Sequence, residues 1–128
     1  MALARSLAAV ARGPVADGKG VEIALLRLEA AFAGGGLLAR RFFRSWLHAR
    51  DDKTATLALA WAREQVRRGL GEVLERERVH GRVRSDVSPE TLSWLILAAS
   101  EAMAHEPPGV SGDRIAMLLE FLRPPGAQ

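Results

Sequence analysis

Apolar residues recur every three or four positions along most of the chain, which is the period of an α-helix. No stretch alternates between apolar and polar residues over a useful length, and no Asn-Gly or Asp-Gly turn joins two such stretches. Gly- and Pro-containing breaks separate the periodic segments. The pattern predicts an all-α fold of about six helices, at 2–12, 21–33, 37–50, 54–79, 88–105 and 111–123.

Local signals mark the ends of several of these helices. Either Asp52 or Thr54 can cap the helix that follows, and Gly81 suits the left-handed position beyond its end. The run Ser88-Pro89-Glu90 has the order of an N-cap, a first helical proline and an acid in the first turn. We therefore expect two helices joined by a short turn in this part of the chain.

The stretch 63–103 contains this hairpin. A charged amphipathic helix leads through a Gly- and Asp-containing turn into a helix that is apolar on nearly every side. Such a helix has to be covered on every side, and a chain of 128 residues has too little other protein to cover it. We therefore expect a second copy of the chain to cover this helix, so that the hairpin is the assembly surface of a homodimer. The expected dimer contacts are Val66, Leu70, Val73, Leu92, Leu95, Ile96, Ala99 and Met103, while Trp94, Leu97, Ala98 and Ala102 form a second apolar face.

Charge within the hairpin is mixed rather than gathered on one face. Residues 63–84 contain seven Arg and four Glu, and the whole chain has a net charge of only +3. The pairs Glu64–Arg68 and Glu72–Arg76 have the favourable i,i+4 order on a helix. Because nucleic-acid binders usually gather basic residues on one surface, we interpret this segment as a solvated, salt-bridged helix face. A phosphate-binding patch is the alternative interpretation.

Two glycines interrupt the same helix, at Gly69 and Gly71. Each weakens a helix by up to ~1 kcal/mol relative to Ala. Glycine in a helix that nevertheless persists often lets a neighbouring backbone come close. We expect such an approach at these two positions.

Composition agrees with a globular protein, since 48% of the residues are hydrophobic and 26% are charged. The length predicts one domain, with an N-terminal helix and linker at 1–20, a helical body at 21–123 and a tail at 124–128. The chain has no cysteine, which excludes disulfides, thiol catalysis and cysteine zinc sites. No apolar run reaches the ~18–20 residues needed to cross a bilayer, so we expect no membrane segment.

Residues 1–12 contain two Arg and no acid, a composition that also occurs in targeting segments. The longest uncharged run, Ser6 to Ala11, is too short for the apolar region of a secretion signal. We interpret the segment as an ordinary amphipathic helix with Leu3, Leu7 and Val10 on one face. A targeting role is the alternative.

The polar residues do not form a recognisable catalytic or metal site. Ser45, His48 and Asp51 or Asp52 are close in sequence, but residues on one helix cannot surround a substrate as a nucleophile, base and orienting group must. His48, His80 and His105 stand singly at helix ends, where an imidazolium is stabilised by the helix dipole. The glycines at 34–36 lack the strand and the Lys-Ser/Thr of a phosphate-binding loop. We therefore expect no enzyme activity, no metal and no cofactor.

Aromatic side chains cluster on three successive predicted helices around the glycines at 34–36. Large aromatics on loosely packed helices can line an apolar pocket, and they can equally be core residues. Both interpretations stay open. The candidate pocket residues are Phe32, Phe42, Phe43, Trp46 and Trp61.

The hairpin turn carries a recognisable motif. It reads Gly, apolar, Arg, any residue, Asp, apolar, any residue, Pro, after a long helix ending in Gly and before an apolar helix. This order resembles the C-terminal domain of TetR-family transcriptional regulators over residues 54–105, and more loosely over 20–123. The residues that carry the resemblance are Gly81, Val83, Arg84, Asp86, Val87 and Pro89.

The resemblance implies an all-α homodimer whose last two long helices pair with their equivalents as a four-helix bundle. The helices before them enclose a pocket for a small, often apolar ligand. It implies transcription regulation, as a repressor acting in the cytoplasm. The family's N-terminal helix-turn-helix of about 50 residues has no counterpart here, because only some 20 residues precede Val21 and the chain has no tyrosine. We therefore expect no DNA-binding residues in this chain, and DNA contact only through a missing N-terminal domain.

Three hypotheses follow for the function. The first is a TetR-type ligand-sensing and dimerisation domain, either truncated or acting as a stand-alone modulator that pairs with a full-length relative. The second is a helical dimeric module that binds a small hydrophobic ligand and has no connection with transcription. The third is a structural interaction protein.

Overall fold

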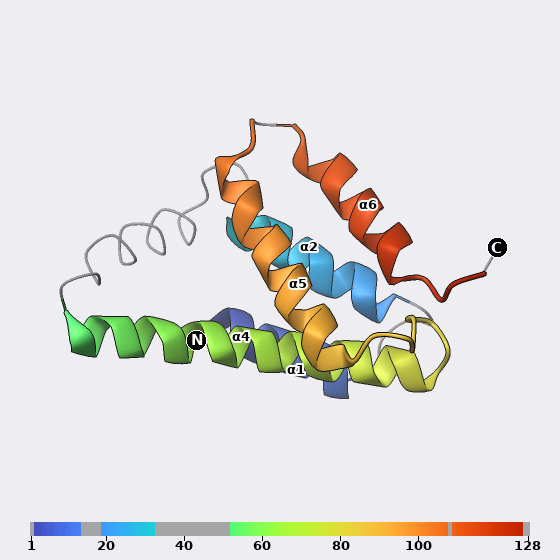
Figure 1. Cartoon of the computed structure of the whole chain (residues 1–128), viewed down its shortest axis with the longest axis horizontal. Coiled ribbons are helices and arrows are strands. Elements are labelled where there is room, and N and C mark those ends of the chain that lie inside the picture. The colour runs from blue at the N-terminus through green and yellow to red at the C-terminus, as the bar shows by residue number, and fades with distance from the viewer. Residues whose placement is uncertain (1, 14–18, 33–51, 108, 127–128) are drawn as a thin grey trace.

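The computed structural model describes residues 2–13, 19–32, 52–107 and 109–126, and these ranges contain helices and no strand. The α-helices are α1 (Ala2–Arg12), α2 (Gly20–Phe32), α4 (Lys53–Val79), α5 (Pro89–Ala102) and α6 (Ser111–Leu122), and the 3-10 helix η2 (Met103–His105) extends α5 (Figure 1). The all-α prediction is confirmed, and five of the expected helices are present at nearly the expected bounds. The helix expected at 37–50 lies outside the described residues.

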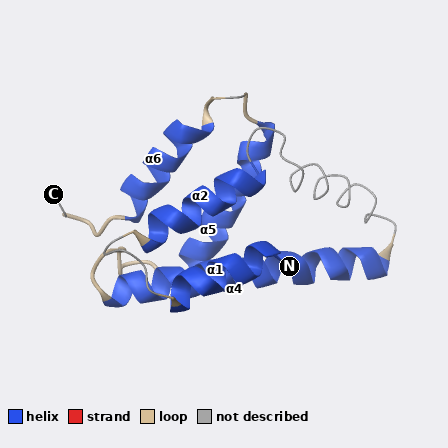
Figure 2. Ribbon diagram, turned by 180° about the vertical axis from the view of Figure 1, so that it is seen from behind, coloured by secondary structure: helices blue, strands red, loops and turns tan. Residues whose placement is uncertain are grey.

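Helix α4 is the spine of the fold. α1 lies along one side of α4 and α5 crosses its other side, so the two appear on opposite faces when the molecule is turned around (Figures 1 and 2). α2 lies between α4 and α6, and α6 is the outermost helix (Figure 2). The N-terminal half of α4 extends beyond the described parts of the other helices (Figure 1).

The predicted helix ends are confirmed by their hydrogen bonds. The Asp52 side chain accepts from the backbone N–H groups of Thr54 and Ala55 at the start of α4, so Asp52 and not Thr54 is the cap. Ser88 caps α5 with Pro89 at its first position. Gly81 has φ of 74°, the left-handed conformation expected after the end of α4.

One apolar core joins α4 to the four other α-helices. It is made by residues that share the inner face of each helix, as the spacing of three and four requires. Among them are Leu7, Leu25, Leu28, Leu70, Leu74, Leu92, Ile96, Ile115 and Leu122.

The two glycines of α4 differ in how closely their neighbours approach. A Cβ at Gly69 would lie 3.0 Å from the Leu7 Cβ and 3.2 Å from the Ala4 carbonyl oxygen, so α1 packs directly against the α4 backbone there. Gly71 faces α5, where a Cβ would lie 3.8 Å from the Ser93 side chain. The predicted close approach is confirmed at Gly69, where α1 lies so near that even a Cβ would be crowded. At Gly71 the prediction is wrong, because a Cβ there would make only an ordinary van der Waals contact.

Candidate interaction surface on the α4–α5 hairpin

The turn between α4 and α5 anchors the C-terminal end of α6. Arg84 makes two 2.7 Å contacts with the Asp86 carboxylate and donates to the Phe121 carbonyl at 3.1 Å. Its backbone N–H donates to the Leu122 carbonyl at 2.8 Å, and its guanidinium lies 4.9 Å from the centre of the Phe121 ring. The hydrogen-bonded contact with Arg84 also lowers the pKa of Asp86. Because the last carbonyls of a helix lack partners within it, the Arg and Asp of the turn motif serve to hold α6.

The C-terminal part of α4 also holds the end of α1. Arg76 donates from a single guanidinium nitrogen to three carbonyl groups, those of Val10 (3.2 Å), Ala11 (2.9 Å) and Gly13 (2.6 Å). Glu72 pairs with Arg12 of α1 at 3.2 Å. The predicted Glu72–Arg76 pair is therefore wrong, because both side chains bond to α1 instead of to each other.

A buried carboxylate lies against the start of α2. Glu77 is only 3% exposed and forms an ion pair with Arg82 of the turn. A Cβ at Gly20, the first residue of α2, would overlap the Glu77 carboxylate, so the close fit there depends on glycine. The last two turns of α4 and the turn that follows them thus fix the ends of α1, α2 and α6.

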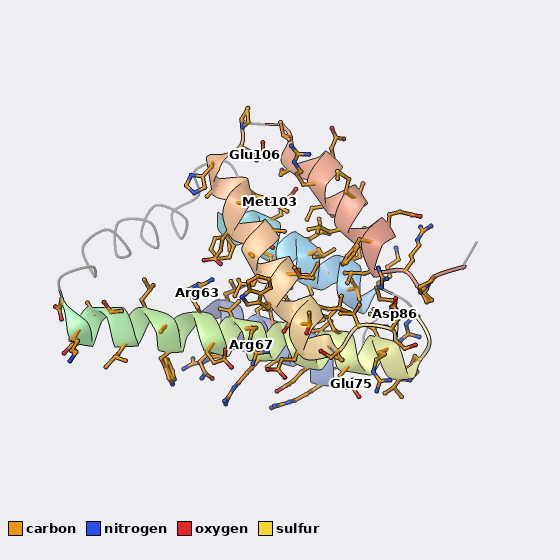
Figure 3. All side chains as sticks on the ribbon, in the orientation of Figure 1. Arg63, Arg67, Glu75, Asp86, Met103 and Glu106 are labelled. Atoms are coloured by element: carbon orange, nitrogen blue, oxygen red, sulfur yellow. The ribbon has the colours of Figure 1, made fainter. Side chains whose placement is uncertain are left out.

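An ion pair and a hydrogen bond join α4 to α5. Arg63 makes two contacts with Glu101 of α5, at 3.0 and 2.6 Å. Arg67 donates to the Ser93 hydroxyl at 3.1 Å while it pairs with Glu64 at 2.8 and 2.5 Å. Arg63 and Arg67 lie on the part of α4 that faces α5 (Figure 3).

Glu64 stands at the centre of a local charge cluster on α4. Hydrogen bonding from Arg67, opposed by partial desolvation, lowers the pKa of Glu64 to about 2. Arg68 contacts the same carboxylate at 3.3 Å, which confirms the expected i,i+4 pair. With the Arg78–Glu75 pair at 2.7 Å, every Arg between positions 63 and 84 has a partner in the chain. This favours the salt-bridged interpretation over a phosphate-binding patch.

Most of the expected dimer contacts are buried by their own chain. Leu95 is 37% exposed and Ala99 is partly buried, but the other six have no surface left for a partner in this conformation. The assignment of those six to a dimer interface therefore needs correction, because their side chains pack against α1, α2 and the rest of the core. They are Val66, Leu70, Val73, Leu92, Ile96 and Met103.

A different set of apolar residues lies on the outside of the hairpin. Among the residues that the structure describes, eight large hydrophobic side chains are exposed. Five of them belong to α4 or α5, and three of those five are more than 60% exposed. The five are Leu57, Trp61, Val79, Trp94 and Leu95. Those on α4 share one helix face with Arg68, Glu72 and Glu75, at spacings of three, four or seven positions. The charged residues between them hide this apolar pattern in the sequence.

An open groove follows α4 over Gly71, where no side chain fills the space beside α5. Its charged lining is balanced, with three Arg and three Glu: Arg67, Arg68, Arg76, Glu72, Glu75 and Glu90. A smaller hollow next to it is lined by Glu64, Arg67, Glu90, Thr91 and Trp94. The outer surface of the hairpin thus combines exposed tryptophans with a charge-balanced groove.

The candidate pocket aromatics do not gather around one cavity in the described part of the chain. Phe32 is a core residue at 3% exposure, whereas Trp61 is 61% exposed on α4. Phe42, Phe43 and Trp46 lie outside the described residues. For Phe32 the core interpretation is therefore the correct one.

The histidines that the structure describes lie at helix ends, as expected. The His80 ring nitrogen Nδ1 lies 2.8 Å from the Arg76 carbonyl oxygen at the end of α4, and His105 ends η2. His48 lies outside the described residues. Within the ranges that the structure covers, no three His, Asp or Glu side chains are placed together as metal ligands.

No protein-family model, curated protein or solved structure matches the chain. None of the helices in the described ranges is both long and apolar enough to span a lipid bilayer. The family resemblance therefore depends on the residues of the turn and on the hairpin around it.

Proposed function

We propose that the chain is the ligand-sensing and homodimerising body of a TetR-type transcriptional regulator. The observation that carries the proposal is the concentration of exposed apolar residues on the outside of the α4–α5 hairpin. Soluble proteins rarely leave large apolar surface without a binding role. Trp61 and Trp94 are each more than half exposed, and tryptophan is enriched among residues that dominate interfaces.

The turn motif adds support, because its residues have structural roles that a hairpin of this kind needs. Val83 is buried, Arg84 and Asp86 hold α6, and Ser88 and Pro89 start α5. The sensing half of the proposal, a small apolar ligand bound among the helices before the hairpin, is supported by the resemblance of this motif.

Sedimentation velocity tests the homodimer. Wild-type protein is expected to sediment at twice the chain mass of 13.9 kDa. The double variant Trp61→Glu/Trp94→Glu should sediment as a folded monomer, because both side chains are exposed within one chain and new charges there repel a partner. Met117→Glu is the matched control, since Met117 is also 61% exposed but lies on α6. A wild-type monomer, or a double variant that stays dimeric, would contradict the proposed interface.

A thermal-shift screen with fatty acids and apolar drug-like compounds tests the sensing role. A ligand that binds only the folded state raises Tm by mass action. At a ligand concentration of 100 times its Kd, the folded state is stabilised by about 2.7 kcal/mol. A saturable rise supports the sensing domain. A dimer that no compound stabilises would instead favour a structural interaction protein.

A further inference from the structure

We propose that the exposed stripe of α4 is self-complementary and packs antiparallel against α4 of a second copy, with Arg68 opposite Glu72 of the partner subunit. We define the α4 stripe as Leu57, Trp61, Arg68, Glu72, Glu75 and Val79, all of which are exposed. This inference rests on the homodimer of the proposed function and specifies the register in which its subunits meet.

In the C-terminal half of α4, the α4 stripe is the one face that the other described helices leave uncovered. Successive members are three, four or seven positions apart, so they share one face of the helix. On one side Gly69 and Arg76 contact α1, and on the other Arg67 and Gly71 face α5. A second helix can therefore approach α4 only along the stripe.

Charge and apolarity along the α4 stripe fit a copy running in the opposite direction. In an antiparallel pair of identical helices, the residue numbers of two facing positions always add up to the same value. With Arg68 opposite the partner's Glu72, that sum also sets Trp61 opposite the partner's Val79. Because the dimer is twofold symmetric, each contact occurs twice. The two Arg68–Glu72 pairs therefore lie between the two Trp61–Val79 pairs. Gly69 and Gly71 fall at the centre, beside the groove that has three Arg and three Glu in its lining.

Neighbouring registers are disfavoured by the same charges. A shift of four residues in one direction sets Arg68 opposite the partner's Arg68, and the same shift in the other direction sets Glu72 opposite the partner's Glu72. Like charges directly opposed across an interface oppose association. The charges of α4 thus favour this register over both four-residue shifts.

Cysteine crosslinking tests the register, and the chain is suited to it because it has no native cysteine. Packed helix axes are about 8–10 Å apart, and subtracting two Cα radii of about 2.3 Å leaves a Cα separation that a disulfide can span. The variant Trp61→Cys/Val79→Cys should therefore form a covalent dimer under mild oxidation. Its two cysteines are about 27 Å apart along one helix, so the crosslink has to be between subunits.

Matched controls make the result specific. Trp61→Cys and Val79→Cys alone should each give roughly tenfold less crosslinked dimer, because each would lie far from its own copy. Leu57→Cys/Val79→Cys and Arg68→Cys report the register shifted by one turn. If these crosslink and Trp61→Cys/Val79→Cys does not, the register is wrong although the homodimer stands. If sedimentation shows a wild-type monomer, the homodimer itself fails.

Charge exchange gives an independent measurement without new covalent bonds. Arg68→Glu should raise the dimer Kd by roughly tenfold, since it sets acids against Glu72 of the partner subunit in two places. Arg68→Glu/Glu72→Arg should restore the wild-type Kd to within about threefold if the two positions face each other. A double variant that is weaker than Arg68→Glu alone would overturn the Arg68–Glu72 pairing.

Discussion

The two halves of α4 differ in what surrounds them. Apart from the α4 stripe, the C-terminal half is enclosed: α1 packs against Gly69, Arg76 bonds to the end of α1, and Glu77 is buried beside Gly20. The N-terminal half has Leu57 and Trp61 more than 60% exposed. One helix therefore organises the fold at one end and presents apolar surface at the other.

This difference shows that apolarity alone does not decide what is buried in this chain. The most tightly enclosed stretch of α4 is its charged half, because glycines and long ionic side chains there let neighbouring helix ends come close. The Leu- and Ala-rich half, which has the more hydrophobic sequence, is the more exposed. Substitutions should accordingly have large effects in the charged half and small ones in the apolar half.

The largest effect is expected from Arg82→Ala. The substitution removes the ion pair of the buried Glu77 carboxylate, and leaving a buried charge without its partner costs about 3 kcal/mol. Urea denaturation measures the loss of unfolding free energy. Arg123→Ala is the control, because the Arg123–Glu120 pair at 3.1 Å is exposed and should contribute less than about 0.5 kcal/mol. Equal losses in the two variants would show that burial at Glu77 has no special cost.

Gly69→Leu is expected to cost about 2 kcal/mol, because the new side chain would push α1 away from α4. Hydrogen exchange should show faster exchange throughout α1 and unchanged exchange in α6. Gly112→Ala is the glycine control. Nothing lies within 4 Å of a Cβ at Gly112, so the substitution should stabilise α6 by about 0.5–1 kcal/mol. Unaltered protection of α1 in Gly69→Leu would contradict the close packing described above.

Acid should weaken the middle of α4 by a smaller amount. The folded-state pKa of Glu64 is about 2, below its ordinary value of 4.5. The contribution of the ionised carboxylate is therefore fully present above pH 4.5 and is lost as the pH falls toward 2. Because the Glu64 side chain is 41% exposed, solvent screening limits the effect to about 1 kcal/mol or less. The difference in unfolding free energy between wild type and Glu64→Gln should shrink over this range, and a constant difference would contradict it.

The smallest effect on folding is expected from Trp61→Ser. A side chain that is 61% exposed has little contact to lose, so the unfolding free energy of the monomer should change by no more than about 0.5 kcal/mol. The measurement has to be made at protein concentrations below the Kd of the dimer. A loss of several kcal/mol would mean that the N-terminal half of α4 is as well enclosed as the C-terminal half.

Local chemistry was sufficient to predict the helices. Asp52, Gly81 and Ser88 determine helix ends through contacts with their own neighbours, and such contacts depend little on the remainder of the fold. The faces of α5 were harder to assign. Apolar residues surround that helix, so its rotation is set by tertiary packing, which buries Leu92 and exposes Trp94.

Contacts between distant segments were not predictable from local spacing. Arg76 has an acid four positions before it, yet it binds carbonyls more than 60 positions away because the end of α1 offers three acceptors. Phe32 and Trp61 both lie among the regularly spaced apolar residues of a helix, yet Phe32 is buried and Trp61 is exposed.

The attachment of α1 also has a consequence for folding kinetics. Leu7 and Gly69 meet across some 60 positions of chain, and Arg76 bonds to residues 63 to 66 positions before it. Contacts that close such long loops form slowly compared with those inside a helical hairpin. We expect α4 and α5 to associate first and α1 to dock late. Substitutions at the α1 contact should therefore speed unfolding and leave the refolding rate nearly unchanged.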